Sequence, residues 1–100
     1  MPSGHIVSKG QEDKFDIQLN YSSPDLDAGE TIVSVTASVK PSGLILGTPG
    51  IQANNTSVYV EVSNGLPGKT YVVLFKTTTS AGRIYNNPDY DSILVKVIPL

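Results

Sequence analysis

The single histidine, His5, is the side chain best suited to proton transfer near neutral pH, and it has no chemical companion in the sequence. The chain has no cysteine, which excludes a thiolate nucleophile, a Cys-ligated metal and a disulfide framework. A Ser-His-Asp site needs the imidazole beside the nucleophile, whereas His5 lies in a polar segment outside any strand pattern. A tetrahedral metal site needs three or four His or Cys ligands. We therefore predict a non-enzymatic protein with no catalytic residue, metal or cofactor.

Acidic residues cluster in two turns that could bind an ion. Asp25 and Asp27 suggest a calcium loop, but Gly29 is fifth counted from Asp25 instead of sixth, and no helix flanks the segment. A second turn could meet the first and share an ion. It contains Asn86, Asn87, Asp89 and Asp91. Solvated turn residues are the favoured interpretation, because an ion or an active site would require both turns to converge.

Length and charge limit the classes of partner. One hundred residues suit one domain, and a net charge of −2 provides no basic field for nucleic acid.

Residues 1–13 lack the basic start and the apolar run of a signal peptide, and no stretch has the roughly 18 apolar residues of a membrane span. We expect a soluble protein with a flexible N-terminal arm at 1–13, which could stay disordered or dock onto a neighbour on assembly, and one domain at 14–100. Charged residues make up only 16%, which favours a partner protein that covers part of the surface.

Strand signals dominate the rest of the chain, which holds 11 Val, 8 Ile and 8 Thr. Apolar side chains two apart fall on one face of an extended strand, as Val33, Val35, Ala37 and Val39 do. The segment 69–79 is apolar on both faces, which is typical of a central strand. The expected strands span 14–21, 30–40, 57–63, 69–79 and 92–98, with minor edge pieces at 44–46 and 51–53.

Turn residues separate these strands, and no helical period intervenes. The pattern predicts an all-β, immunoglobulin- or fibronectin-III-like antiparallel sandwich of about seven strands. The segment from Leu66 to Tyr71 resembles the turn into strand F of such domains, where a tyrosine hydroxyl bonds back to the backbone. Tyr71 is the candidate for this tyrosine corner; an ordinary core tyrosine is the alternative.

Other side chains suggest binding. Arg83 and Lys76, with Tyr85, could form a small cationic patch, although isolated surface charges explain them equally well. Tyr59, Tyr85 and Tyr90 could stack on sugar rings if they lay coplanar on one face. A carbohydrate-binding module is therefore the alternative function.

Several strand and turn motifs follow one another along residues 14–98. They are Phe15 to Tyr21, Gly29-Glu30-Thr31-Ile32, Pro41-Ser42-Gly43-Leu44, Gly68-Lys69-Thr70-Tyr71, and the run from Thr77 to Arg83. In this order they resemble the small phage Ig-like proteins described as fiber or tail adaptor and capsid decoration components. Two features depart from that family: the chain has no tryptophan, and the loop from Tyr85 to Tyr90 is extended.

The resemblance implies a bacteriophage structural protein, present in the virion and in the host cytoplasm before assembly. Its partners would be capsid, neck, tail or fiber proteins, with no nucleic acid and no membrane, and self-association in the assembled particle stays open. The candidate partner contacts are Ile6, Val7, Arg83, Tyr85 and Tyr90.

Overall fold

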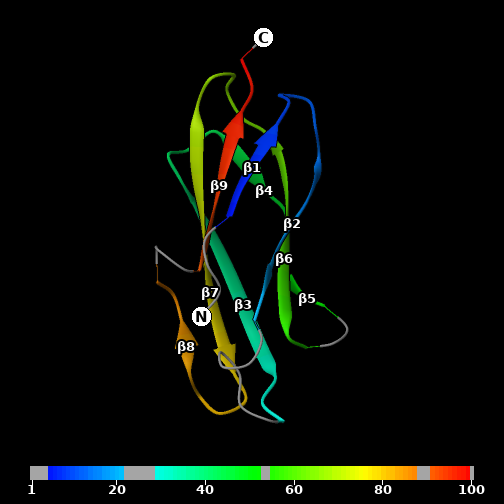
Figure 1. The fold of residues 1–100 in the computed structure, drawn as a ribbon, viewed down its shortest axis with the longest axis vertical. Coiled ribbons are helices and arrows are strands. Elements are labelled where there is room, and N and C mark those ends of the chain that lie inside the picture. The colour runs from blue at the N-terminus through cyan, green and yellow to red at the C-terminus, as the bar shows by residue number, and fades with distance from the viewer. Residues whose placement is uncertain (1–4, 22–28, 53–54, 88–90, 100) are drawn as a thin grey trace.

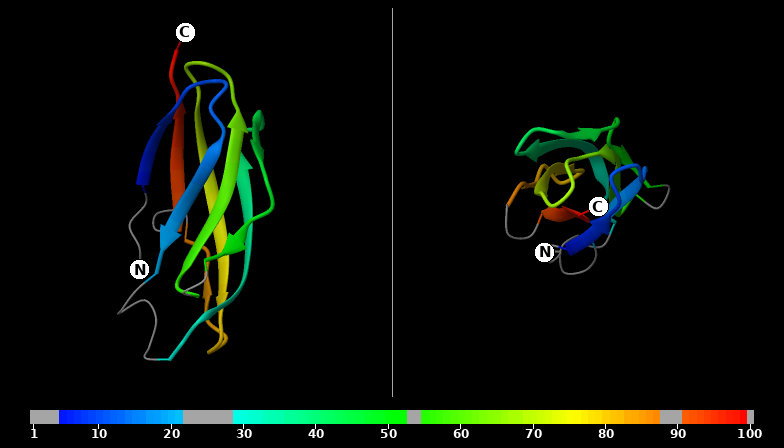
Figure 2. Two further views of the ribbon diagram at one scale, coloured as in Figure 1. Left: turned by 90° about the vertical axis from the view of Figure 1, so that its right-hand side faces the viewer. Right: turned by 90° about the horizontal axis from the view of Figure 1, so that it is seen from above.

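Two β-sheets packed face to face form the fold in the computed structural model, which describes residues 5–21, 29–52, 55–87 and 91–99 (Figures 1 and 2). One sheet has the strand order β1-β9-β7-β3, with β8 paired to β7; the other has the order β2-β6-β4, with β5 paired to β6. None of the described residues forms a helix long and apolar enough to cross a membrane. The predicted all-β sandwich is confirmed. The strands are His5–Lys9 (β1), Phe15–Asn20 (β2), Ile32–Lys40 (β3), Leu44–Leu46 (β4), Gly50–Ile51 (β5), Ser57–Asn64 (β6), Thr70–Thr79 (β7), Ile84–Tyr85 (β8) and Ser92–Val97 (β9).

The core is built mainly from the inward faces of four strands, with Ile32 of β3 and Leu44 of β4 added to them. Val58, Val60 and Val62 on β6 have no exposed surface, and they follow the two-residue period that the sequence predicts. Their counterparts on the other strands are equally buried. These are Ile17 and Leu19 on β2, Tyr71, Val73 and Phe75 on β7, and Ile93, Val95 and Val97 on β9. Full burial of one such side chain contributes about 1.5–3 kcal/mol, so this interface dominates the stability of the fold.

Strand β3 departs from the predicted face. Val33 is 56% exposed, whereas Ile32 is buried at 3%. A β-bulge between Ile32 and Ser34 in the pairing with β7 shifts the alternation by one residue. Val35 and Ala37 then face the core, but they are only partly buried, because β3 lies at the edge of its sheet.

Strand β1 lies in the segment that the sequence analysis assigns to a flexible arm. Residues His5–Lys9 pair in parallel with β9, with Val7 opposite Val95 and Lys9 opposite Val97. The alternation of apolar and polar residues did not predict this strand, because its inward positions are Val7 and Lys9 and a lysine normally lies at the surface. The structure therefore places these five residues in the sheet.

Lys9 has no exposed surface, and its ammonium group is fully coordinated by backbone. The Nζ atom donates to the carbonyl oxygens of Gly10 at 2.8 Å, Gln11 at 3.0 Å and Asn64 at 2.6 Å, which uses all three of its protons. Burial lowers the pKa of this group, and the carboxylate of Asp13 partly offsets that shift. Lys9 thus joins the end of β1 to the end of β6 in the opposite sheet.

Tyr71, near the start of β7, contacts two loops that connect one sheet to the other. Its ring is buried, and its hydroxyl oxygen accepts the backbone N–H of Leu66 at 2.9 Å, five residues upstream. The hydroxyl also lies against Gly43, where an added Cβ would come within 2.9 Å of it. The contact supports the tyrosine-corner assignment predicted for this residue.

We expect Lys9→Met to lower the free energy of unfolding by about 1–3 kcal/mol, because three backbone carbonyls lose their donor while the side chain keeps its length. Urea denaturation measures this difference. Lys14→Met is the matched control, since Lys14 is 64% exposed and its ion pair with Glu61 is weak. Equal effects of the two substitutions would contradict the structural role of Lys9.

We expect Tyr71→Phe to cost about 1–2 kcal/mol of stability, because the Leu66 N–H loses its acceptor in a partly buried site. Thermal unfolding followed by circular dichroism measures the loss. Tyr59→Phe serves as the control, because the Tyr59 hydroxyl makes no hydrogen bond with the described residues. A Tyr71→Phe protein as stable as Tyr59→Phe would show that the corner contact contributes nothing.

Candidate interaction surface

The predicted partner contacts lie in two separate places. Ile6 and Val7 belong to β1, in the half of the sandwich that holds the C-terminus. Tyr85 belongs to β8 in the opposite half, and Arg83 directly precedes that strand (Figure 1). Ile6 is 65% exposed, while Val7 packs against the core. Tyr90 lies outside the described residues. The structure therefore does not bring these residues into one patch.

Arg83 is held by a buried carboxylate. Its guanidinium bonds Glu30 through Nη2 and through Nε at 3.0 Å, and Thr79 Oγ1 donates to the same carboxylate. The Glu30 side chain is 3% exposed, whereas that of Arg83 is 40% exposed. Arg83 thus neutralises an internal charge and still presents part of its guanidinium at the surface. Lys76, the other cation of the predicted patch, is exposed in the middle of β7.

Tyr85 links this ion pair to the sandwich interior. The Arg83 guanidinium carbon lies 5.9 Å from the centre of the Tyr85 ring, and that ring stacks on Tyr21 at a centroid distance of 5.4 Å. The Tyr21 hydroxyl lies 2.8 Å from Asp91 Oδ1 and 3.1 Å from Thr77 Oγ1. The short β7–β8 hairpin is therefore tied to the other sheet through Tyr21, which follows β2.

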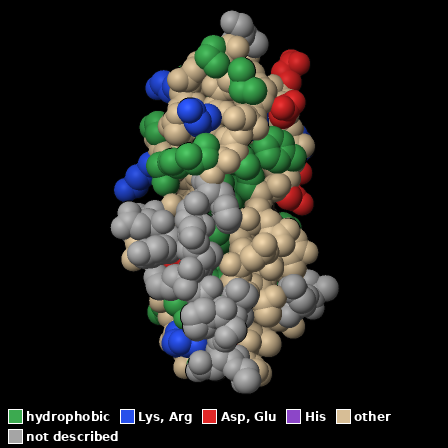
Figure 3. All heavy atoms as spheres, in the orientation of Figure 1, with side chains coloured by type: hydrophobic (Ala, Val, Ile, Leu, Met, Phe, Trp, Pro, Cys, Tyr) green, Lys and Arg blue, Asp and Glu red, His purple; other side chains and the backbone are tan. Residues whose placement is uncertain are grey.

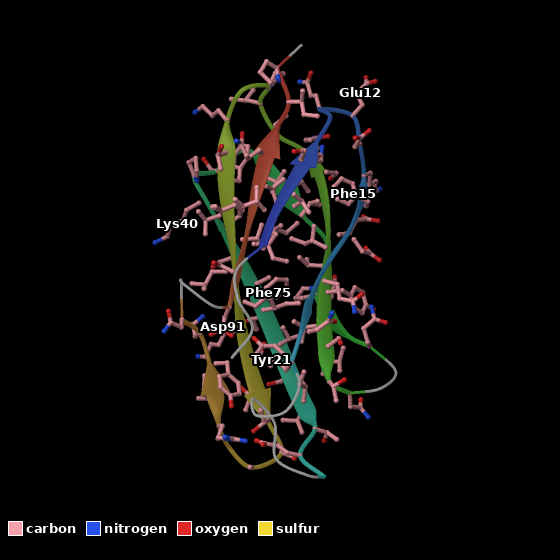
Figure 4. The ribbon with its side chains drawn as sticks, viewed as in Figure 1. Glu12, Phe15, Tyr21, Lys40, Phe75 and Asp91 are labelled. Carbon is pink, nitrogen blue, oxygen red and sulfur yellow. The ribbon has the colours of Figure 1, made fainter. Side chains whose placement is uncertain are left out.

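Asp91 is a fully buried carboxylate directly before β9 (Figure 4). Oδ1 accepts the Tyr21 hydroxyl, and Oδ2 accepts the backbone N–H of Asn87 at 2.7 Å. Burial, together with the neighbouring Asp91 carboxylate, raises the pKa of Tyr21 above its usual value of 10; the hydrogen bond with Thr77 acts in the opposite direction. At neutral pH, Tyr21 is therefore a protonated donor.

The acidic turns do not form a demonstrated ion site. Asp25, Asp27 and Asp89 lie outside the described residues, and Asp91 is occupied by internal hydrogen bonds. Within the part of the chain that the structure describes, no group of three His, Asp or Glu side chains could hold a metal ion.

Sequence reasoning missed the buried charges Lys9, Glu30 and Asp91, although the two-residue period contained a signal for the two carboxylates. Glu30 is two residues before the buried Ile32, and Asp91 is two residues before the buried Ile93. Extending each inward face by one step therefore points to these carboxylates. Such groups at strand ends close the core with hydrogen bonds in place of apolar contacts.

A family model for the podophage GP4 fiber-tail adaptor protein gp77 matches residues 9–88 of the chain. The chain belongs to this family. The predicted resemblance to phage fiber or tail adaptor proteins is thereby confirmed. No curated protein matches the sequence.

The family match extends from the buried Lys9 to the end of the β8 region, so it includes the Glu30–Arg83 pair and the Tyr21–Tyr85 stack. Strand β9 lies beyond the matched residues, although it lies between β1 and β7 in the sheet. The matched residues therefore form most of both sheets.

The carbohydrate-binding alternative is not favoured in this adaptor-family protein. Tyr59 belongs to β6 in one sheet and Tyr85 to β8 in the other, so they share no flat face. Tyr59 packs over Gly50, where an added Cβ would lie 2.5 Å from its hydroxyl, and Tyr85 stacks on Tyr21. Both rings have structural contacts within the chain.

We expect Tyr21→Phe to lower the free energy of unfolding by about 1–3 kcal/mol at neutral pH, because buried Asp91 loses a donor. This difference should shrink above about pH 10. The folded-state pKa of Tyr21 is raised, so the unfolded state releases the phenolic proton first, and the stabilisation is lost as pH rises. Urea denaturation between about pH 7 and 11 measures the trend. A stability difference that stays constant over this range would contradict it.

Proposed function

We propose that this protein is a non-enzymatic, Ig-like adaptor that connects fiber and tail proteins in a bacteriophage virion. The observation that carries the proposal is the family match over residues 9–88, because the family is described as a fiber-tail adaptor. The same description favours a position between tail and fiber over the decoration of a capsid. The chain would be present in the host cytoplasm before it assembles on the particle.

The strand order supports the Ig-like assignment. Immunoglobulin-type sandwiches place strands B, E and D in one sheet and C, F and G in the other. Here β2, β6 and β4 form one sheet, and β3, β7 and β9 form the other in the matching order, with β1 added beside β9. Strand β7 corresponds to F, and Tyr71 is its second residue. The Tyr71 hydroxyl accepts the backbone N–H of Leu66, the contact expected of a tyrosine corner.

The use of the buried ionisable groups supports a non-enzymatic role. A general acid or base must reach the proton that it transfers. The buried groups of this chain bind internal partners instead. Lys9 donates to Asn64, Glu30 accepts from Arg83, and Asp91 accepts from Tyr21. These contacts hold strand ends together, which is the property that a rigid connector needs.

Separate exposed regions support a connector. Ile6 belongs to an open sheet face near the C-terminal end, whereas the partly exposed Arg83 lies near the β7–β8 hairpin at the opposite end. A module that contacts two proteins at once needs two such regions. We propose Ile6, Val7, Arg83, Tyr85 and Tyr90 as partner contacts distributed between them.

An amber mutation in the gene for this chain tests the proposal. We expect particles made without suppression to retain their tails but to lack fibers by electron microscopy and mass spectrometry, because the connecting module is missing. A plasmid copy of the wild-type gene should restore the fibers. Fibers that remain attached without the chain, or wild-type particles that contain none of it, would refute the adaptor function.

A further inference from the structure

The outer faces of the two sheets carry opposite charge. Lys40, Lys76 and Lys96 lie at outward positions of β3, β7 and β9 and are exposed, and none of them forms an ion pair with a described residue. In the upper half of Figure 3, basic side chains gather toward the left of the view and acidic side chains toward the right. Of the remaining described cations, Lys9 is buried, Lys14 and Arg83 are each paired with a carboxylate, and Lys69 is exposed in the turn before β7. We call the outer face of β1-β9-β7-β3 the basic face.

The centre of the basic face is apolar. The strand register aligns Ile6 with Leu94 and Leu94 with Val72, and Val72 in turn aligns with Lys40. Directly opposed residues have Cβ atoms about 4.5–5.5 Å apart, so the apolar row is continuous across β1, β9 and β7 and ends at Lys40 on β3. Leu74 lies two residues farther along β7, and a shallow hollow between Ser38, Lys40, Val72 and Leu74 adjoins the row. The basic face therefore combines an apolar centre with a rim of lysines, as a protein-binding surface does.

The opposite outer face, formed by β2, β6 and β4, is acidic. Asp16 lies directly across from Glu61 in the β2–β6 register, an arrangement that is unfavourable for like charges. Lys14 Nζ lies 3.7 Å from Glu61 Oε1, but this pair is exposed and compensates little. The same face carries Ile45, which is 53% exposed. We call this surface the acidic face. Lysines supplied by another molecule would relieve the repulsion between its carboxylates.

We infer that the basic face of one copy docks on the acidic face of a second copy. Both halves of a complementary contact are present on the same chain, and they lie on the two outer sides of one sandwich. Lysines of the basic face would neutralise Asp16 and Glu61, while the apolar row covering Val72 would meet the region around Ile45. Such a contact is heterologous, so each copy retains one free face for the next, and the copies form a ring or an open stack.

The inference concerns the purified chain and does not depend on the proposed connection between fiber and tail. Analytical ultracentrifugation from about 10 µM to about 1 mM measures self-association directly. We expect association that weakens as NaCl rises from about 20 mM to about 500 mM, because salt screens the charged rims of the two faces.

Lys96→Glu and Lys14→Glu form a matched pair, because they make the same substitution and the same change in net charge on opposite faces. We expect Lys96→Glu to weaken association at least about tenfold, and Lys14→Glu to leave it unchanged or to strengthen it. Circular dichroism verifies that both variants fold. Equal effects of the two substitutions would refute the assigned faces.

A charge exchange tests the pairing itself. One double variant carries Lys40→Glu and Lys96→Glu on the basic face, and a second carries Asp16→Lys and Glu61→Lys on the acidic face. Each variant alone should lose self-association, and mixing the two should restore it. A wild-type chain that stays monomeric at the highest concentration and lowest salt, or a mixture that does not associate, would overturn the inference. If in addition Lys96→Glu blocked incorporation into particles, the basic face would bind an acidic virion protein instead. Neither result bears on whether fibers require the chain, so the proposed function is tested separately.

Discussion

The whole structure depends on the apolar contact between the inward faces of two sheets, centred on Val60 of β6 and on Val73 and Phe75 of β7. This contact removes water from the strand ends as well as from the middle, so each polar group there needs a partner inside the protein. Lys9 finds three carbonyls, Glu30 finds Arg83, and Asp91 finds Tyr21. The buried charges are thus a consequence of the core, and they also join the two sheets.

This arrangement separates stability from recognition. Inward positions and strand ends hold the sandwich together, whereas the outward positions of the same strands remain available for contacts. On β7, for example, Phe75 is buried in the core while the adjacent Lys76 is exposed. An adaptor benefits from this separation, because its outer faces can be adapted to different neighbours without disturbing the hydrophobic contact inside.

Sequence periodicity predicted the inward faces of β2 and β6, because strict alternation leaves only one side of a strand apolar enough to bury. It located β7 and β9 as well, but both faces of these strands are apolar, so the packing of the sheets decided which face is inward. On β3 the periodicity failed only at the start, where a bulge moved Ile32 inward and Val33 outward, since a bulge is set by pairing with β7. It also failed at β1, where the inward residues are Val7 and Lys9. A lysine is buried only where carbonyls from another strand converge on it, and that convergence depends on the tertiary structure.

By itself, the sequence determined the all-β class, the positions of most strands and the membership of the adaptor family, because these follow from local alternation and from motifs in order along the chain. The register of β1 on β9, the Glu30–Arg83 and Tyr21–Asp91 contacts, and the opposite charge of the two outer faces were decided only by the tertiary structure. Each joins residues that are far apart in the chain, and only the pairing of strands brings them together.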